Sequence, residues 1–478
     1  MQLMKRKRYV LSILLLSAIV ALAMGVKASY AKDHADEKTQ LMQCLTPKVL
    51  RLAKTTQVGL IAEDLTNGEL LYSQNATQSF LPASVIKLVT AIAALAYLPE
   101  DYQFKTRIGL VGKQVGQLFS GQAYIKFAGD PSFKSDYLTR FVEKLYAQGV
   151  RRFNGNIIVD RHDFTAPDAA PGWLVDNMHI CYAAPINALI LDENCRRTEI
   201  FTEDHKVIIK PEFPLSFSNQ VKISDDMSLP CRLEIGIKQG NHVVFYGCMQ
   251  PQQSYRLALA VRDPLDYLAQ RLQQVFKQQG ITWQGKVREG SSAKQGNAFI
   301  YFHSQPLGLM IEEMLATSNN IIAEALLKKL GQLYYHQPGS FTDGIAAIKA
   351  ILTDQLHLDT ENWLLYDGSG LSRYNQVTPE QFNQLLIALY KKPMLYKKVY
   401  AALPRLGVDG RLVYYSVPRH LKGKIRGKTG SMQGVSNLVS IVKLSSGHDV
   451  AVSLFLSPGL NKFKNYRKVQ MNLLDCFA

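Results

Sequence analysis

The sequence predicts a mixed α/β (α+β) protein in which an antiparallel sheet flanked by helices is interrupted by a large, mainly β insertion. Three observations predict this fold. Apolar strand-like runs lie near both ends of the chain, apolar stretches bounded by proline or glycine indicate buried helices, and the long middle region alternates polar and apolar residues between turns. With 478 residues, 47% of them hydrophobic, the chain is globular and long enough for two or three domains.

The first 31 residues stand apart from the rest. Residues 5–8 are all basic, an apolar run from Val10 to Met24 follows, and small residues stand at Ser29 and Ala31. The run is shorter than the roughly 20 residues that a membrane-spanning helix needs. We therefore expect a signal peptide, residues 1–31, that is cleaved after Ala31 and leaves no stable membrane anchor; an uncleaved anchor is the alternative.

Both ends of the mature chain predict strands of a single sheet. Four runs pair into two hairpins, which turn at Asn67-Gly68 and at residues 445–447: 58–65 with 69–72, and 438–444 with 448–456. A final helix over about 462–476 has one apolar side. Residues 32–105 and 300–478 are therefore expected to form one discontinuous domain.

Three further helices are predicted in this domain. Pro82 and Pro99 bracket an apolar stretch over 83–98, so Ser84 falls in a first helical turn, where unsatisfied backbone amides create a positive end. A second helix spans about 307–330 and is expected to stop at Gly331. Thr378, followed by proline, caps the start of a third.

Residues 106–299 are expected to be inserted into that domain as β-rich material, organised as two nested domains. Its clearest elements are four strands, followed by one helix: 122–127, 155–159, 206–209, 256–261 and 265–278. No internal repeat or low-complexity linker interrupts it.

The six cysteines are an even set in an exported chain, which favours disulfides over metal ligands, and no metal or cofactor is expected. Cys231 and Cys248 bracket two alternating runs around Gln239-Gly240. If these two residues form the loop of a hairpin, the numbers of any two residues that face each other add up to 479. Cys231 and Cys248 satisfy this condition, so a disulfide between them is predicted. Cys181 and Cys195 are then plausible local partners, and Cys44 and Cys476 remain, either as a bridge or as free thiols.

Three short strings occur in order along the chain and suggest an active-site serine acyltransferase: Ser84-Val85-Ile86-Lys87, Ser318-Asn319-Asn320 and Lys428-Thr429-Gly430. A serine hydroxyl is a weak nucleophile at neutral pH and needs an adjacent base. Lys87 follows Ser84 by three residues, on the same helical face, and burial beside Lys428 would lower its pKa toward the neutral form. A surface lysine is the alternative.

The other two strings supply the remaining groups. Ser318 could relay a proton to the leaving amine and Asn320 could orient the substrate, although Ser-Asn-Asn would also suit a helix break or cap. Lys428 and Thr429 suit the carboxylate of a C-terminal residue. The backbone amides of Ser84 and Ser431 are candidates for an oxyanion hole. Taken alone, Lys-Thr-Gly is usually a turn.

These strings resemble those of the class C low-molecular-mass penicillin-binding proteins, the D-alanyl-D-alanine carboxypeptidase/endopeptidase type. Four further segments carry the same resemblance: Gly129-Asp130-Pro131-Ser132-Phe133, Gly172-Trp173, residues 367–373 and residues 428–434. The resemblance covers nearly the whole mature chain. It implies a penicillin-binding-protein/serine β-lactamase-like transpeptidase domain and a serine peptidase of peptidoglycan. Through an acyl-enzyme this peptidase would remove C-terminal D-Ala from stem pentapeptides, cleave D-Ala–diaminopimelate cross-links, or both.

The resemblance also implies binding residues and inhibitors. Gly430 and Ser431 would bind substrate beside Lys428 and Thr429, and members bind β-lactams covalently. A pocket for the diaminopimelate side chain would consist of four residues: Asp160, Phe164, Arg373 and Gln433. Solvated loop charge is the alternative for Asp160 and Arg373. In the family, aspartate is common at the middle position of the second string, where this chain has Asn319, but the residue at this position varies.

The net charge of +16 leaves the mature protein basic, which suits a polyanionic cell wall in the periplasm. No nucleic-acid motif is present, so the expected partners are peptidoglycan stem peptides and β-lactam antibiotics, with a homodimer left open. Two rival functions remain: a serine β-lactamase, and a non-catalytic wall-binding scaffold of the same fold.

Overall fold

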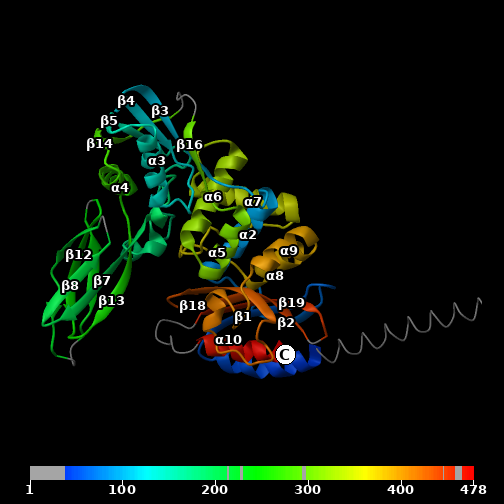
Figure 1. The fold of residues 1–478 in the computed structure, drawn as a ribbon. Helices are drawn as coiled ribbons and strands as arrows, with labels where there is room; N and C mark the ends of the chain where they lie inside the picture. Colours follow the sequence, from blue (N-terminus) through cyan, green and yellow to red (C-terminus); the bar gives the residue numbers. More distant parts are fainter. Residues whose placement is uncertain are drawn as a thin grey trace, which may run out of the picture.

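The computed structural model describes residues 38–477 apart from 213–214, 227–229, 239, 293–297, 445 and 458–465. The signal-peptide prediction therefore lies outside the described residues, as does the start of the predicted last helix. Within them, no helix is both long and apolar enough to cross a membrane. In Figure 1 the blue and red segments, at the two ends of the described residues, lie together, and the insertion, drawn from cyan to green, extends away from them.

A five-stranded antiparallel sheet joins the two ends of the chain. Its order is β17-β18-β19-β1-β2. The strands run as follows: β17 (Ile425–Met432), β18 (Val435–Lys443), β19 (Asp449–Ser457), β1 (Gln57–Asp64) and β2 (Leu70–Gln74). β1 pairs with β19 over its whole length, from Gln57 opposite Ser457 to Asp64 opposite Val450. The prediction that both ends contribute to one sheet is confirmed, and β17 is left at the edge.

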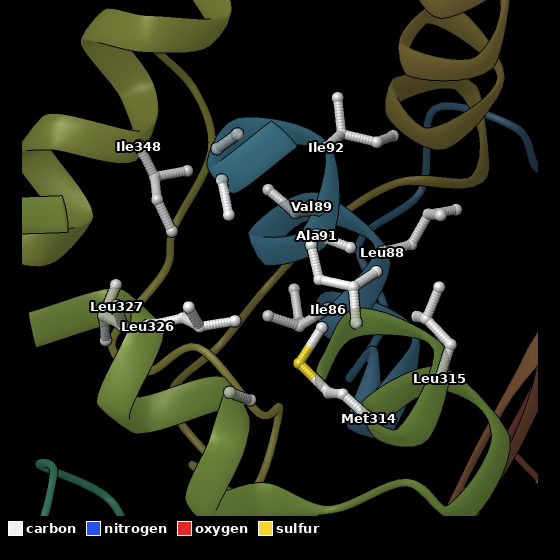
Figure 2. Packing of buried hydrophobic residues seen from close by; sticks show 14 of the residues in the cluster. Ile86, Leu88, Val89, Ala91, Ile92, Met314, Leu315, Leu326, Leu327 and Ile348 are labelled. Atoms are coloured by element: carbon white, nitrogen blue, oxygen red, sulfur yellow. The ribbon is translucent and has the colours of Figure 1, made fainter. Parts of the chain in front are cut away.

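Helices cover both faces of this sheet. A helix over residues 38–53 and α10 (Tyr466–Leu474) pack on one face. The other face supports a helical layer: α2 (Ile86–Tyr97), α5 (Leu307–Thr317), α6 (Asn320–Tyr335), α7 (Phe341–Leu356), α8 (Pro379–Tyr390) and α9 (Pro393–Ala402). α2 lies at the centre of that layer, and Figure 2 shows its Ile86 and Val89 among Met314 of α5 and Leu326 of α6. Fully buried aliphatic side chains on all sides explain why this helix is almost entirely apolar.

The predicted helix over 307–330 is wrong in two respects. The structure divides it into α5 and α6 at Ser318, which adopts left-handed φ/ψ angles of 64° and 38°, while Asn319 caps α6 by accepting from the amides of Ile321 and Ile322. The helix also passes the expected stop at Gly331 and ends at Tyr335. Close packing of α7 explains why a glycine stands within the helix at this position, since a Cβ on Gly331 would lie 2.6 Å from the amide nitrogen of Gly344.

The insertion is built on a mixed seven-stranded sheet. Its members are β3 (Lys105–Val115), β4 (Leu118–Lys126), β5 (Arg152–Asn154), β6 (Ile157–Asp160), β14 (Thr282–Gln284), β15 (Val287–Glu289) and β16 (Ala298–His303). The helices α3 (Ser135–Ala147) and α4 (Pro264–Gln278) share a hydrophobic core with this sheet. β16 pairs with β3, so the sheet reaches beyond the predicted boundary at residue 299.

A smaller β region is nested within this insertion and has its own hydrophobic cluster. One sheet contains β7 (Cys195–Glu203), β8 (Lys206–Pro211) and β13 (Ser254–Ala260). The other contains β9 (Ser216–Asn219), β10 (Lys222–Ile223), β11 (Leu233–Ile237) and β12 (His242–Met249). The domain limits stay a prediction, which the separate clusters support.

Three disulfides are present: Cys44–Cys476, Cys181–Cys195 and Cys231–Cys248. The hairpin around the last of them differs from the prediction by one residue in register, because Ile237 pairs with Val243 and the positions sum to 480. The amide of Lys238 also donates to the carbonyl of His242, so the loop has three residues. Gly240 supplies the positive φ of 71° that three-residue loops favour.

Removing the Cys44–Cys476 bridge should destabilise the protein. It joins the helix over residues 38–53 to the end of the chain across 432 residues of sequence. Because a cross-link of this span restricts the unfolded chain strongly, the double substitution Cys44→Ser and Cys476→Ser should cost about 2–5 kcal/mol. Denaturant unfolding without reductant measures the effect. Cys231→Ser with Cys248→Ser, in the nested region, is the matched control, and equal losses in both variants would contradict the prediction.

Candidate active site

Ser84 stands on a short 3-10 turn, Ala83–Val85, that leads directly into α2. The chain enters this turn with Ala83 at a positive φ of 49°. Gly370 lies against that residue, and a Cβ on Gly370 would lie only 1.9 Å from the carbonyl oxygen of Ala83. The absence of a side chain at Gly370 therefore lets the loop that contains it pack against the serine.

The amine of Lys87 is fully buried and joins three segments of the chain. Its Nζ donates to Ser84 Oγ at 3.0 Å, to Asn320 Oδ1 at 2.7 Å and to the carbonyl oxygen of Ser369 at 2.8 Å. Burial lowers the pKa of Lys87 to about 7, although the nearby carboxyl groups of Glu324 and Asp367 oppose this shift. A neutral amine beside the hydroxyl can accept its proton, and the alternative of a surface lysine is excluded.

The break between α5 and α6 directs two side chains of the second string into the same site. Asn320 is the first residue of α6, and its Nδ2 donates to the carbonyl oxygen of Tyr182 at 2.8 Å. Ser318 Oγ accepts from Lys428 Nζ at 3.0 Å. The string is thus both a helix break and part of the site, so the two interpretations of Ser-Asn-Asn hold together.

Lys428 lies on the edge strand β17, with only 1% of its surface exposed. Besides Ser318, its Nζ donates to the carbonyl oxygen of Thr429 at 2.9 Å. Burial, the charge of Lys87 and that of Arg411 together lower the pKa of Lys428 well below its usual range. Two lysines with lowered pKa values therefore serve one site, since Lys87 bonds to Ser84 and Lys428 bonds to Ser318.

The free edge of β17 directs the amide of Ser431 away from the sheet. The amide of Gly427 donates to Pro404 and the carbonyl of Ile425 accepts from Leu406, both outside the β17–β18 pairing. Along an antiparallel strand, every second residue directs its backbone groups to the same side. The amide of Ser431 therefore points away from β18, as that of Gly427 does. Gly430 brings the strand close to the nucleophile, since a Cβ there would lie 3.2 Å from the amide nitrogen of Ser84.

Two buried carboxyl groups, which the sequence analysis did not identify as site residues, hold the loop around Ser369. Glu324 accepts from the amides of Gly368 and Ser369, each at 2.8 Å. Asp367 accepts from the amide of Gly370 at 2.8 Å and from Trp173 Nε1 at 2.9 Å. Glu324 lies one helical turn after Asn320 on α6, a spacing of four residues that could have indicated it.

A cavity of about 440 Å³ opens beside Ser84. Its lining includes residues of all three strings, Ser84, Ser318, Asn320 and Thr429, and also Ser431. Arg373 and Gln433 line it as well, and Arg373 Nη2 donates to the carbonyl oxygen of Gln433 at 3.4 Å. Tyr182 and Arg411 also line it, although neither was singled out from the sequence.

The predicted four-residue side-chain pocket is wrong for Asp160 and Phe164, which do not line this cavity. Asp160 faces a different cavity. Burial raises the pKa of its carboxyl group, but hydrogen bonds from Ser292 and His162 outweigh this effect and lower the pKa to about 2. The ring of Phe164 is buried against Gly129, where a Cβ would approach it to 2.3 Å. Both residues are engaged by the insertion itself.

The chain is similar to known proteins over nearly its whole length. A family model described as the D-Ala-D-Ala carboxypeptidase 3 (S13) family matches residues 47–475. The D-alanyl-D-alanine carboxypeptidase DacB of Haemophilus influenzae is 29% identical over 416 residues, which cover 85% of this chain and 86% of that protein. The D-alanyl-D-alanine carboxypeptidase of an Actinomadura species is 27% identical over 407 residues, covering 80% and 74%.

The solved structures confirm the fold. The crystal structure of penicillin binding protein 4 (dacB) from Haemophilus influenzae superposes with a TM-score of 0.83 at 28% identity, covering 90% of this chain and 97% of that one. A structure of the same protein complexed with a β-lactam gives 0.79 at 27% identity, with the same coverage. The resemblance stated from the sequence is therefore confirmed.

Replacing Glu324 by glutamine should destabilise the loop beside Ser84. A carboxylate accepts from two backbone amides at once, whereas the NH₂ group of glutamine would face one of these donors and leave it unpaired. Leaving a buried donor unpaired costs about 1–3 kcal/mol. Thermal unfolding measures the loss, and Glu312→Gln, an exposed position on α5, is the control. Equal stability of the two variants would contradict the role assigned to Glu324.

Proposed function

The chain belongs to the D-Ala-D-Ala carboxypeptidase 3 (S13) family, and from this premise we propose that it is a serine-type peptidase of peptidoglycan that cleaves after D-Ala. Its substrates are stem peptides that end in D-Ala-D-Ala, cross-links in which D-Ala is joined to diaminopimelate, or both. The observation that carries this proposal is the 3.0 Å hydrogen bond from the buried amine of Lys87 to Ser84 Oγ. It joins a nucleophile to a base whose pKa is suited to neutral pH.

In the acylation step, Ser84 Oγ attacks the carbonyl carbon of the penultimate D-Ala while Lys87 Nζ accepts the hydroxyl proton. The carbonyl oxygen becomes an oxyanion, which the amides of Ser84 and Ser431 stabilise. The peptide bond then breaks and the leaving amine takes a proton through Ser318, which is hydrogen-bonded to Lys428. Water afterwards attacks the ester of Ser84, which releases the shortened peptide and restores the hydroxyl.

Groups along β17 bind the substrate on both sides of the cleaved bond. The hydroxyl of Thr429 and the hydrogen-bond donor Nζ of Lys428 suit the carboxylate of the leaving D-Ala. The glycine at 430 lets the substrate backbone approach the strand. On the other side, Arg373 and Gln433 contribute to binding the stem-peptide side chain, since both line the cavity next to Ser84. Asn320 holds Lys87 and orients a peptide group of the substrate.

The protein acts in the periplasm. A signal peptide over residues 1–31 would export it, and the three disulfides require an oxidising compartment. A basic mature chain suits a substrate within an anionic wall. The sequence leaves a homodimer open, and light scattering of the mature protein tests it.

The proposal is tested with a labelled penicillin and with purified muropeptides. The mature protein should form a persistent covalent adduct on Ser84, and Ser84→Ala should form none. It should also release D-Ala from uncross-linked pentapeptides, split cross-linked dimers, or do both. Rapid turnover of the penicillin would instead indicate a β-lactamase. A folded protein that neither forms an adduct nor cleaves a muropeptide would be a non-catalytic scaffold.

The rate of acylation should rise with pH up to about 7. Only neutral Lys87 accepts the proton of Ser84, and its pKa is lowered to about 7, so acid protonates the base and suppresses the reaction. Below pH 7 the second-order rate constant for penicillin labelling should fall about tenfold per unit. Circular dichroism at each pH verifies that the protein stays folded. A flat profile from pH 5 to 8 would exclude Lys87 as the base.

A further inference from the structure

Arg411 lines the cavity of the active site, although the reaction described above assigns it no part. It belongs to a short 3-10 turn, Gly410–Tyr414, which packs against the end of α5, since a Cβ on Gly410 would lie 2.9 Å from the carbonyl oxygen of Ala316. Arg411 Nε donates to the carbonyl oxygen of Thr317 at 3.0 Å. The side chain is exposed, and no hydrogen bond to another described residue occupies the two terminal nitrogens of its guanidinium group.

Two contacts place Arg411 on the leaving-group side of the cleaved bond. The residue to which it donates directly precedes Ser318, whose hydroxyl passes a proton to the leaving amine in the proposed reaction. The chain just before the turn, residues 404–406, is hydrogen-bonded to residues 425–427 at the start of β17. Lys428 follows these residues, and Arg411 is close enough to it to lower its pKa. The turn therefore lies at the end of β17 that holds Lys428.

The other two arginines of the cavity lie nearer to the opposite end of this strand. Arg373 donates to the carbonyl oxygen of Gln433, which directly follows β17. Arg467 belongs to α10, and this helix is hydrogen-bonded to the residue of β18 that pairs with Ser431. Among the described residues that line the cavity, Arg411 is therefore the cation of the leaving-group side.

The leaving group brings a negative charge to this side. Its carboxylate is attached to the carbon atom that carries the departing amine, so it must bind close to Ser318. Thr429 and Lys428 offer hydrogen bonds, but the pKa of Lys428 is lowered well below its usual range and its side chain does not line the cavity. A guanidinium group stays charged and binds a carboxylate through two parallel hydrogen bonds. No aspartate or glutamate among the described residues of the cavity competes for it.

We propose that Arg411 determines specificity for the leaving group by binding the free carboxylate beside the departing amine. This inference rests on the proposed function and names a residue and a substrate class within it. The class consists of peptides in which the residue after the cleaved bond has an unmodified α-carboxylate. A C-terminal D-Ala has this group, and so does diaminopimelate that is cross-linked through the amine next to a free carboxylate. Amidation of that carboxylate therefore protects either substrate from cleavage.

Two peptides that share one acyl part and end in D-Ala-D-Ala or D-Ala-D-alaninamide test this role. Both give the same acyl-enzyme and have nearly the same size, so the ratio of their kcat/KM values reports the charge of the leaving group. Wild type should prefer the free carboxylate, and added salt should reduce the ratio. Arg411→Gln should lower the ratio about tenfold because a charged hydrogen-bond donor is lost. Arg411→Lys, which keeps the charge without the fork of donors, should give an intermediate ratio.

Arg419→Gln is the matched control, because Arg419 is exposed in the same part of the chain and does not line the cavity. It should keep the wild-type ratio. A merely structural role of Arg411 would lower kcat/KM for both peptides together, so an active Arg411→Gln variant with the wild-type ratio refutes the inference. If this variant does not fold, Arg411→Lys and the salt dependence of the wild-type ratio decide.

The outcomes also separate this inference from the proposed function. If wild type cleaves both peptides equally well, or if salt does not change the ratio, the role of Arg411 is refuted while the proposed function stands. If wild type cleaves neither peptide and forms no adduct with penicillin, both are refuted.

Discussion

The buried amine of Lys87 is the interaction on which the rest of the site depends. Taking an amine out of water is costly unless its hydrogen-bonding capacity is satisfied. Lys87 meets this condition with acceptors from three segments: Ser84 on its own helix start, Asn320 on α6 and the carbonyl of Ser369. If any of these moved, the fully buried amine would lose a hydrogen-bond partner. The arrangement therefore fixes the geometry of the base and its nucleophile together.

α6 transmits this constraint to the rest of the molecule. Its first turns supply Asn320 to Lys87 and Glu324 to the Ser369 loop. Further along the same helix, the fully buried Nζ of Lys328 donates to the carbonyl oxygens of Thr165, Pro167 and Ile186, all in the insertion. One helix thus positions the active site at its start and anchors the insertion along its length. This rigid connection explains how the site stays intact although the chain leaves the domain for the long insertion, residues 106–299.

The sequence predicted those features that depend on local chemistry. The apolar helix after Pro82 and the two terminal hairpins each follow from periodicity or turn residues. It left the break at Ser318 as one of two interpretations of Ser-Asn-Asn, because a left-handed residue between two helices needs no glycine or proline. It also did not identify Glu324, whose role arises only when a loop more than forty residues later folds over it.

Asp160 and Phe164 show the limit of inference from a resemblance. Both occur at positions that matched a pattern. In the structure, however, Asp160 accepts a hydrogen bond from Ser292, and the ring of Phe164 packs against the backbone of Gly129. These partners lie 132 and 35 residues away along the chain. Local sequence does not specify such contacts, so the residue type can persist while its surroundings change.

The C-terminal helix links the stability of the fold to the charge of the cleft. Gln470 on α10 is fully buried, donates to the carbonyl of Ser436 on β18 and accepts from the hydroxyl of Tyr415 at 2.7 Å. Tyr415 lines the cavity, and Arg467 stacks on its ring from one turn earlier on α10. The guanidinium therefore reaches the cleft only while α10 stays against the sheet. Cys476, which follows α10, is bonded to Cys44, so the disulfide adds to the contacts that hold this helix against the sheet.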